Sequence, residues 1–203
     1  FDGFYHGWVA SDLIAKLNLI DGNHTLEDFS NAAPEWVKPL EGNYRNIKIH
    51  EAPPNSQGLV ALIILAILER FNFNKISKAD HTHIFCDATK IGYFLRDLYL
   101  ADTEYNRLSF DHFLKSKIID QYASKIDMNK AKTYGKSDFP NHPDTIYLTV
   151  RDNRGMTISF INSLFDAFGS GITSPTSGVL FNCWGIAFNT IDVHSHEFIR
   201  TKR

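Results

Sequence analysis

The sequence predicts an α+β fold in which helices dominate before residue 143 and sheet strands follow it. Apolar residues recur at helical spacing in the first part of the chain, and after Pro143 they alternate with polar residues. The chain has 203 residues, of which 43% are hydrophobic and 22% charged. This composition is typical of a globular protein with enough apolar material for one core, or for a share of a larger one.

The expected helices follow from apolar spacing and capping residues. The first covers 4–19, where a stripe of apolar side chains repeats every four residues. Thr25 and Asp28, three residues apart, predict the start of a short helical turn. The apolar run 59–68 is about half of the roughly 20 residues that a membrane-spanning helix requires, so we expect a buried helix there. Two further helices are expected, over 82–100 and 112–123.

The remaining segments are predicted to be extended or irregular. Alternating apolar residues favour a strand or an extended arm over 43–51. The polar stretch 128–143 predicts an exposed loop. Two strands should follow it, over 146–150 and 156–161, joined by a turn at 152–155.

The net charge limits the classes of binding partner, and the first residues of the chain bear on targeting. The formal net charge of −2 and the pI near 6.5 give no electrostatic reason to expect nucleic acid or an anionic membrane surface. The chain opens with Phe1 and no charged-then-apolar leader, so we expect any targeting segment to lie outside these residues. The compartment is therefore left open.

The cysteines and histidines do not predict a metal site. Only Cys86 and Cys183 are present, which excludes a disulfide framework and leaves one bridge open. His81 and His83 open a helix, where residues two apart do not share a face, and we expect solvated or capping roles for them. His194 and His196 have the same spacing, and neither pair of histidines has convincing further ligands. No metal and no cofactor are predicted.

Several ordered motifs carry a resemblance to a known family. The segments 144–155 and 159–165, the glycine turn Phe168–Ile172 and the strand 178–188 resemble the start of the small subunit of the gamma-glutamyltransferase (gamma-glutamyltranspeptidase) family. Upstream motifs resemble the end of its large subunit: residues 4–7, residues 53–58, and the series His83, Asp87, Ala88, Lys90, Arg96, Asp97 and Asp102. The resemblance covers nearly the whole chain.

The resemblance implies an N-terminal-nucleophile hydrolase, with part of a four-layer αββα fold in which two sheets lie between helical layers. It implies one structural domain made as a precursor, with residues 1–144 from the large-subunit region and 145–203 from the small-subunit region. Cleavage between Asp144 and Thr145 would free the threonine amine, which can take the hydroxyl proton. Thr145 would then attack a γ-glutamyl amide such as glutathione, and Ser163 would place a hydroxyl beside it.

Other interpretations of the same residues stay open. Threonine is common at the start of a strand for reasons of propensity alone, so Thr145 fits that role as well. Ser163 could be a strand-end hydroxyl bonded to nearby backbone. Gly169 and Gly171 are expected to be turn glycines with positive φ. Cys183 is typical of a small buried hydrophobic residue.

Three residues depart from the family pattern where the substrate is expected. Ala187 stands where well-known members carry an acid for the substrate ammonium group. Trp184 stands where glutamine or arginine is usual, and Phe165 where several members have a polar residue. These substrate-binding candidates leave the substrate open. An acylase acting on a different amide, and a degenerate or truncated member without catalysis, are the alternatives.

We also expect the chain to depend on segments of the same precursor beyond these residues. The family's oxyanion glycines and its carboxylate-binding arginine have no counterpart here. One oxyanion donor contributes about 2.7 to 4 kcal/mol to transition-state stabilisation, so this chain alone should be a poor catalyst. Uncovered apolar faces should make it associate or be marginally stable.

Overall fold

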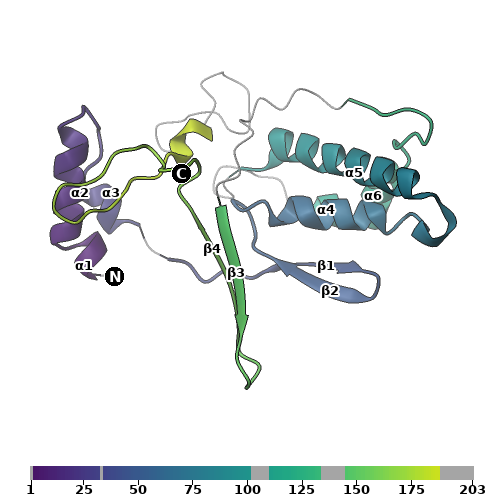
Figure 1. The fold of residues 1–203 in the computed structure, drawn as a ribbon, viewed down its shortest axis with the longest axis horizontal. Helices are drawn as coiled ribbons and strands as arrows, with labels where there is room; N and C mark the ends of the chain where they lie inside the picture. The colour runs from purple at the N-terminus through teal and green to yellow at the C-terminus, as the bar shows by residue number, and fades with distance from the viewer. Residues whose placement is uncertain (1, 33, 102–109, 134–144, 188–203) are drawn as a thin grey trace. The chain divides into compact units, whose positions relative to one another are not determined.

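The computed structural model describes residues 2–32, 34–101, 110–133 and 145–187, which belong to two compact units (Figure 1). Unit 1 comprises residues 1–35 and 139–187, and unit 2 comprises residues 36–138 and 188–203. None of the helices in the described ranges is long and apolar enough to cross a membrane.

Unit 1 begins with three helices. They are α1 (Asp2–Tyr5), α2 (Trp8–Asn18) and α3 (Leu26–Ser30). The single helix expected over 4–19 is interrupted at Gly7, which has extended backbone angles and caps α2. A Cβ at Gly7 would lie 2.6 Å from the carbonyl oxygen of Gly3, so glycine allows the two helices to meet closely there.

Helix α3 starts as the sequence predicts. The Thr25 side chain accepts the backbone N–H of Asp28, and the Asp28 carboxylate accepts the backbone N–H of Thr25. This reciprocal capping box satisfies donors that the first turn of a helix leaves free.

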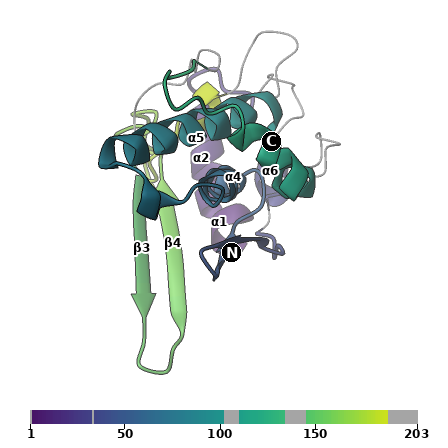
Figure 2. The same ribbon diagram turned by 90° about the vertical axis from the view of Figure 1, so that its right-hand side faces the viewer.

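Unit 1 also contains the antiparallel hairpin of β3 (Thr145–Arg151) and β4 (Thr157–Ser163). Figure 2 shows the two strands side by side, joined by a turn at one end. In this turn the Asp152 carboxylate accepts the N–H groups of Arg154 and Met156, and Gly155 has a φ of +89°. Both predicted strands are confirmed, each with ends shifted by one or two residues.

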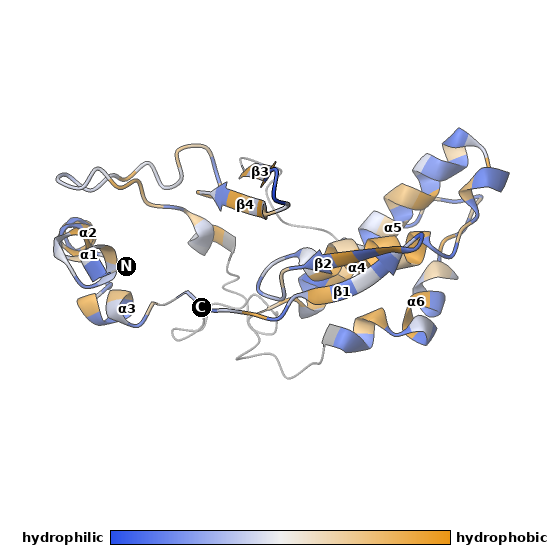
Figure 3. Cartoon of the chain, turned by 90° about the horizontal axis from the view of Figure 1, so that it is seen from below, coloured by the Kyte–Doolittle hydropathy of each residue, from blue (hydrophilic) through white to orange (hydrophobic). Residues whose placement is uncertain are grey.

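The hairpin has one apolar face. Its large side chains are between 41% and 66% exposed: Ile146, Leu148, Val150, Ile158 and Phe160. Figure 3 shows that both strands of the hairpin contain hydrophobic and hydrophilic residues. The opposite face is richer in hydroxyl groups, and Thr149 and Ser159 both donate to the Tyr147 hydroxyl oxygen.

Unit 2 is built on a buried helix. Its elements are β1 (Leu40–Tyr44), β2 (Ile47–Glu51), α4 (Gly58–Leu68), η1 (Phe73–Lys75), α5 (Lys78–Tyr99), η2 (Phe110–Leu114) and α6 (Ser116–Ala123). The predicted burial of the apolar run is confirmed, since Ile63 and Ile67 of α4 are at most 1% exposed. They belong to one core with Ile84 and Ile91 of α5 and Ile119 of α6.

Two elements of unit 2 differ from the prediction. The extended segment expected over 43–51 is not one strand: it contains the end of β1, a turn and β2. Arg45 and Asn46 have positive φ angles of 48° and 67° and reverse the chain between the two strands. Strands therefore also occur before residue 143. Helix α5 starts four residues earlier than expected, because Ser77 and Asp80 form a second capping box.

The helix and the loop expected toward the end of unit 2 agree with the structure in part. The helix expected over 112–123 is divided into η2 and α6. Of the loop expected over 128–143, residues 128–133 are described, and 134–143 lie outside the described residues.

Candidate active site

The candidate nucleophile and its proposed helper lie opposite each other in the β3–β4 hairpin. Thr145 is the first residue of β3, and Ser163 is the last residue of β4. Directly opposite residues of an antiparallel pair have Cβ atoms about 4.5 to 5.5 Å apart, which brings short side chains into contact. The Thr145 hydroxyl donates a hydrogen bond to Ser163 Oγ over 3.0 Å.

Ser163 also organises the chain that follows β4. Its Oγ accepts the backbone N–H of Phe165 at 3.0 Å, and its carbonyl oxygen accepts the indole N–H of Trp184 at 3.3 Å. Phe165 has a φ of +82°, so the chain turns sharply directly after the strand. Ser163 therefore forms hydrogen bonds with Thr145, Phe165 and Trp184.

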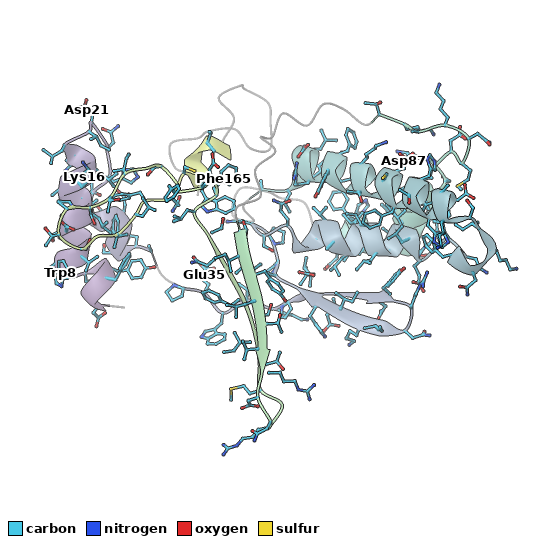
Figure 4. The ribbon with its side chains drawn as sticks, viewed as in Figure 1. Trp8, Lys16, Asp21, Glu35, Asp87 and Phe165 are labelled. Atoms are coloured by element: carbon cyan, nitrogen blue, oxygen red, sulfur yellow. The ribbon has the colours of Figure 1, made fainter. Side chains whose placement is uncertain are left out.

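The two predicted substrate-binding aromatic residues form a pair. The ring centroids of Phe165 and Trp184 lie 4.8 Å apart, with an angle of 60° between the ring planes. Figure 4 labels Phe165, which follows the end of β4. Trp184 begins the short helix η3 (Trp184–Ala187), and the N–H of Cys183 donates to the Leu164 carbonyl at 3.0 Å. This backbone bond keeps η3 at the end of β4.

The glycine turn holds the segment before η3 in place. Gly169 and Gly171 have φ angles of +54° and +69°, which confirms the prediction of turn glycines. A Cβ at Gly169 would lie 2.3 Å from the Phe181 carbonyl oxygen, whereas one at Gly171 would meet nothing within 4 Å. Only Gly169 is thus required for close packing of the backbone.

A second contact joins this segment to helix α2. The Asp12 carboxylate accepts the backbone N–H of Ser177 at 2.7 Å. This bond, together with hydrogen bonds from Ser177, Thr176 and Ser174, holds the pKa of Asp12 below its ordinary value of 3.8, although partial desolvation opposes the shift. Ser174 is 2% exposed and accepts the N–H of Val179. Asp12 thereby fixes the loop that leads back to Trp184.

The structure describes some of the other predicted site residues only in part. Ala187 is the last residue of η3, and its side chain lies outside the described part of the chain. Asp144, the other residue of the expected cleavage site, also lies outside it. The site that the structure does bring together consists of Thr145, Ser163, Phe165 and Trp184.

His81, His83 and Cys183 each contact a backbone carbonyl oxygen. His81 Nε2 lies 2.7 Å from the Phe73 carbonyl oxygen, and His83 Nε2 lies 2.9 Å from that of Asp127. Cys183 Sγ lies 3.4 Å from the Leu164 carbonyl oxygen, and both cysteines are free thiols. Within the described ranges, no group of three or more His, Cys, Asp or Glu side chains could hold a metal ion.

The upstream motif around Asp87 has a structural role in unit 2. Asp87 is fully buried, and its carboxylate lies 2.9 Å from Lys90 Nζ. Lys90 also donates to the Lys132 carbonyl, and the Lys132 N–H donates to Asp87. Asp87 appears on α5 in Figure 4. These contacts fasten the segment around Lys132 to α5.

The contacts of Asp12 and of the Trp184 indole were not predicted. Asp12 and Ser177 are 165 residues apart in the chain, and Trp184 and Ser163 are 21 apart. An acidic residue on a helix and a tryptophan in a loop give no local signal of such bonds. Only the fold brings these partners together.

Fold and site thus define a helix-and-sheet protein with a threonine at the start of a strand, bonded to a facing serine. The chain belongs to the gamma-glutamyltranspeptidase family, whose model matches residues 1–201. This is a family of enzymes, N-terminal-nucleophile hydrolases that are made as self-processing proenzymes.

Relatives include the glutathione hydrolase-like YwrD proenzyme of Bacillus subtilis, 30% identical over 98% of this chain and 38% of its own length. The glutathione hydrolase proenzyme of Escherichia coli is 30% identical over 89% of this chain and 33% of its own length. The chain thus spans less than two fifths of the length of these relatives.

A solved structure supports the fold assignment. The crystal structure of cephalosporin acylase from Bacillus halodurans matches 100% of this chain and 37% of its own, with a TM-score of 0.90 and 30% identity. The predicted α+β class with N-terminal-nucleophile hydrolase architecture is thereby confirmed.

Proposed function

We propose that Thr145 is the nucleophile of an amide-cleaving N-terminal-nucleophile hydrolase and becomes N-terminal by self-cleavage after Asp144. The observation that carries the proposal is the 3.0 Å hydrogen bond from the Thr145 hydroxyl to Ser163 Oγ, at the end of the hairpin opposite its turn. Membership of a family of proenzymes supports it. Residues 1–144 and 145–203 would then belong to two subunits of one structural domain.

The chemistry needs one residue to act as both nucleophile and base. Once the α-amine of Thr145 is free, it takes the hydroxyl proton while the oxygen attacks the amide carbonyl. The amide C–N bond breaks, the amine leaves with a proton, and the acyl group stays on Thr145 as an ester. Water then gives hydrolysis, and an acceptor amine gives transfer.

Ser163 is proposed as a positioning residue. A hydroxyl hydrogen bond limits the rotation of the Thr145 side chain and so keeps the attacking oxygen in one orientation. Ser163 is itself held by the N–H of Phe165 and by the indole of Trp184. This support is what a precise orientation requires.

Family membership favours γ-glutamyl amides such as glutathione as substrates, with the remaining segments of the precursor as partner. The cephalosporin acylase match and the aromatic pair Phe165–Trp184 favour a second candidate, an acylase acting on a different amide. Both candidates use the same Thr145 ester.

Self-cleavage is tested by following the intact mass of the full gene product over time. The unmodified protein should split between Asp144 and Thr145, and Thr145→Ala should stay whole. Thr149→Ala is the matched control, because Thr149 lies on the same face of the same strand and donates to Tyr147. If the unmodified protein also stays whole, the chain is a non-catalytic scaffold and the proposal fails.

A further inference from the structure

The hairpin register explains why the side chains of Thr145 and Ser163 meet and where the Ser163 backbone points. Hydrogen-bonded and non-hydrogen-bonded pairs alternate along an antiparallel ladder. Asp152 and Met156 form a hydrogen-bonded pair, because the Asp152 N–H donates to the Met156 carbonyl at 2.9 Å. Thr145 and Ser163 lie an odd number of steps further along the ladder, so they form a non-hydrogen-bonded pair. The side chains of such a pair are close, and its backbone N–H and C=O groups point away from the partner strand.

The outward-facing carbonyl of Ser163 is the group that Trp184 binds. The indole N–H of Trp184, which can only donate, reaches this oxygen at 3.3 Å. The Ser163 hydroxyl oxygen accepts the backbone N–H of Phe165 at 3.0 Å, a turn typical of serine. Phe165 has a φ of +82°, which persists in a residue other than glycine only where its surroundings hold it. The turn after β4 is therefore held at both the backbone and the side chain of Ser163.

Trp184 is itself fixed by contacts with the residues that follow Ser163. The N–H of Cys183 donates to the Leu164 carbonyl at 3.0 Å, and the indole ring lies 4.8 Å from the Phe165 ring. The backbone N–H of Trp184 donates to Asn182 Oδ1 at 3.1 Å. The indole N–H thus has a defined position from which it can hold Ser163.

We infer that Trp184 is a positioning residue for the Thr145 nucleophile and acts through Ser163. The indole holds the Ser163 carbonyl, the backbone of Ser163 sets the place of its Oγ, and this oxygen holds the Thr145 hydroxyl at 3.0 Å. The inference rests on the proposed function. It assigns Trp184 a different role from the substrate contact expected from the sequence.

Self-cleavage is the step in which this positioning is measured. The Thr145 oxygen forms a bond to the Asp144 carbonyl carbon, the peptide C–N bond breaks, and the hydroxyl proton passes to the departing Thr145 nitrogen. Water then cleaves the ester, which gives the Asp144 carboxylate and restores the Thr145 hydroxyl. The rate depends on how well the attacking oxygen is oriented.

The first test follows the intact mass of the full gene product over time. Trp184→Phe keeps an aromatic ring beside Phe165 and removes the N–H donor. We expect it to lengthen the half-time of the split about fivefold, as for the loss of one hydrogen bond. Trp8→Phe makes the same exchange at an exposed tryptophan of α2 and should leave the half-time unchanged. Because the reaction is intramolecular, its half-time in the soluble fraction does not depend on the amount of folded protein.

A double-variant cycle with Ser163→Ala separates positioning from a general loss of structure. If Trp184 acts through the Ser163 hydroxyl, Trp184→Phe should slow cleavage by less than about twofold once Ser163→Ala is present. A purely structural role predicts the same slowing, about fivefold, in both backgrounds, because the free-energy effects of independent sites add. That result would overturn the inference.

An isosteric replacement tests the N–H group alone. A benzothiophene amino acid at position 184 keeps the size of the indole and its packing on Phe165, and has sulfur in place of the N–H. We expect it to slow cleavage as much as Trp184→Phe does. Cleavage at the unmodified rate contradicts the inference and leaves the proposed function standing. If the unmodified protein itself stays whole, the proposed function fails and the inference fails with it.

Discussion

At the scale of single residues, Ser163 is the point on which the candidate site depends. Its side chain bonds to Thr145 on one strand and to Phe165 beyond the other, and its carbonyl bonds to Trp184. Neither Thr145 nor Trp184 is buried, so packing does little to fix their side chains. Hydrogen bonds to Ser163 must do it instead.

Ser163→Ala should slow self-cleavage about tenfold, because the Thr145 hydroxyl loses a hydrogen bond of roughly 1.4 kcal/mol. The half-time of the split, followed by intact mass, measures this. Ser163→Thr should restore most of the rate. Ser159→Ala removes a hydroxyl from the same face of the same strand and should change the rate little. Equal rates for Ser163→Ala and Ser159→Ala would mean that Ser163 does not position the nucleophile.

Part of this site could be predicted from the sequence. The resemblance placed Thr145 and Ser163 together. Their position directly opposite each other is a finding of the structure, because the strands predicted over 146–150 and 156–161 included neither residue. The position of the Trp184 indole could not be predicted, because it depends on the path of residues 170–183. That path is fixed by bonds such as the one from Ser170 to the Phe181 carbonyl, which no short motif encodes.

At the scale of elements, capping and turn residues decide where segments begin and end. The start of α5 was predicted four residues too late because Lys78, Ala79, Asp80 and His81 lack the apolar periodicity used to place it. The Ser77–Asp80 pair was the available signal. In β1–β2, an Arg–Asn turn is weaker evidence for a hairpin than Asn–Gly, so one extended segment was expected instead of two strands.

Ser77→Ala should lower the free energy of unfolding of unit 2 by about 1 kcal/mol, because it removes the cap of the long helix α5. Urea unfolding followed by circular dichroism measures the change. Thr25→Ala removes the equivalent cap of α3, a helix with no buried residues, and should cost less. A larger loss for Thr25→Ala would contradict this account.

Gly169 and Gly171 both have positive φ, so alanine substitutions at the two positions can be compared directly. Gly171→Ala should cost about 1 to 2 kcal/mol, because alanine is strained at positive φ. Gly169→Ala should cost clearly more, since its Cβ would also clash with the Phe181 carbonyl 2.3 Å away. Thermal unfolding of the two variants compares them. Equal losses would show that the Phe181 segment moves away without cost.

At the scale of the whole molecule, the apolar face of the β3–β4 hairpin should drive association. Its five large side chains are each at least 41% exposed, and such contiguous apolar surface usually marks an interface. The 203-residue chain should therefore form oligomers at micromolar concentration.

Replacing Ile158 and Phe160 together by serine should shift the chain toward the monomer, as measured by size-exclusion chromatography with light scattering. The control replaces two residues on the opposite face of the same strand, as Ser159→Thr and Ile161→Ser, and should shift the chain toward the monomer less. A monomeric parent chain would contradict the prediction.

If the chain is cut before Thr145, Asp12 and Ser177 belong to different polypeptides. Their hydrogen bond then joins the two subunits of a heterodimer. Because folding lowers the pKa of Asp12 below 3.8, the stabilisation from this bond is fully present above that value and is lost as the pH falls through the lowered pKa. The two pieces should travel together in gel filtration at neutral pH and come apart more readily in acid, and Asp12→Asn should weaken their hold at neutral pH as well.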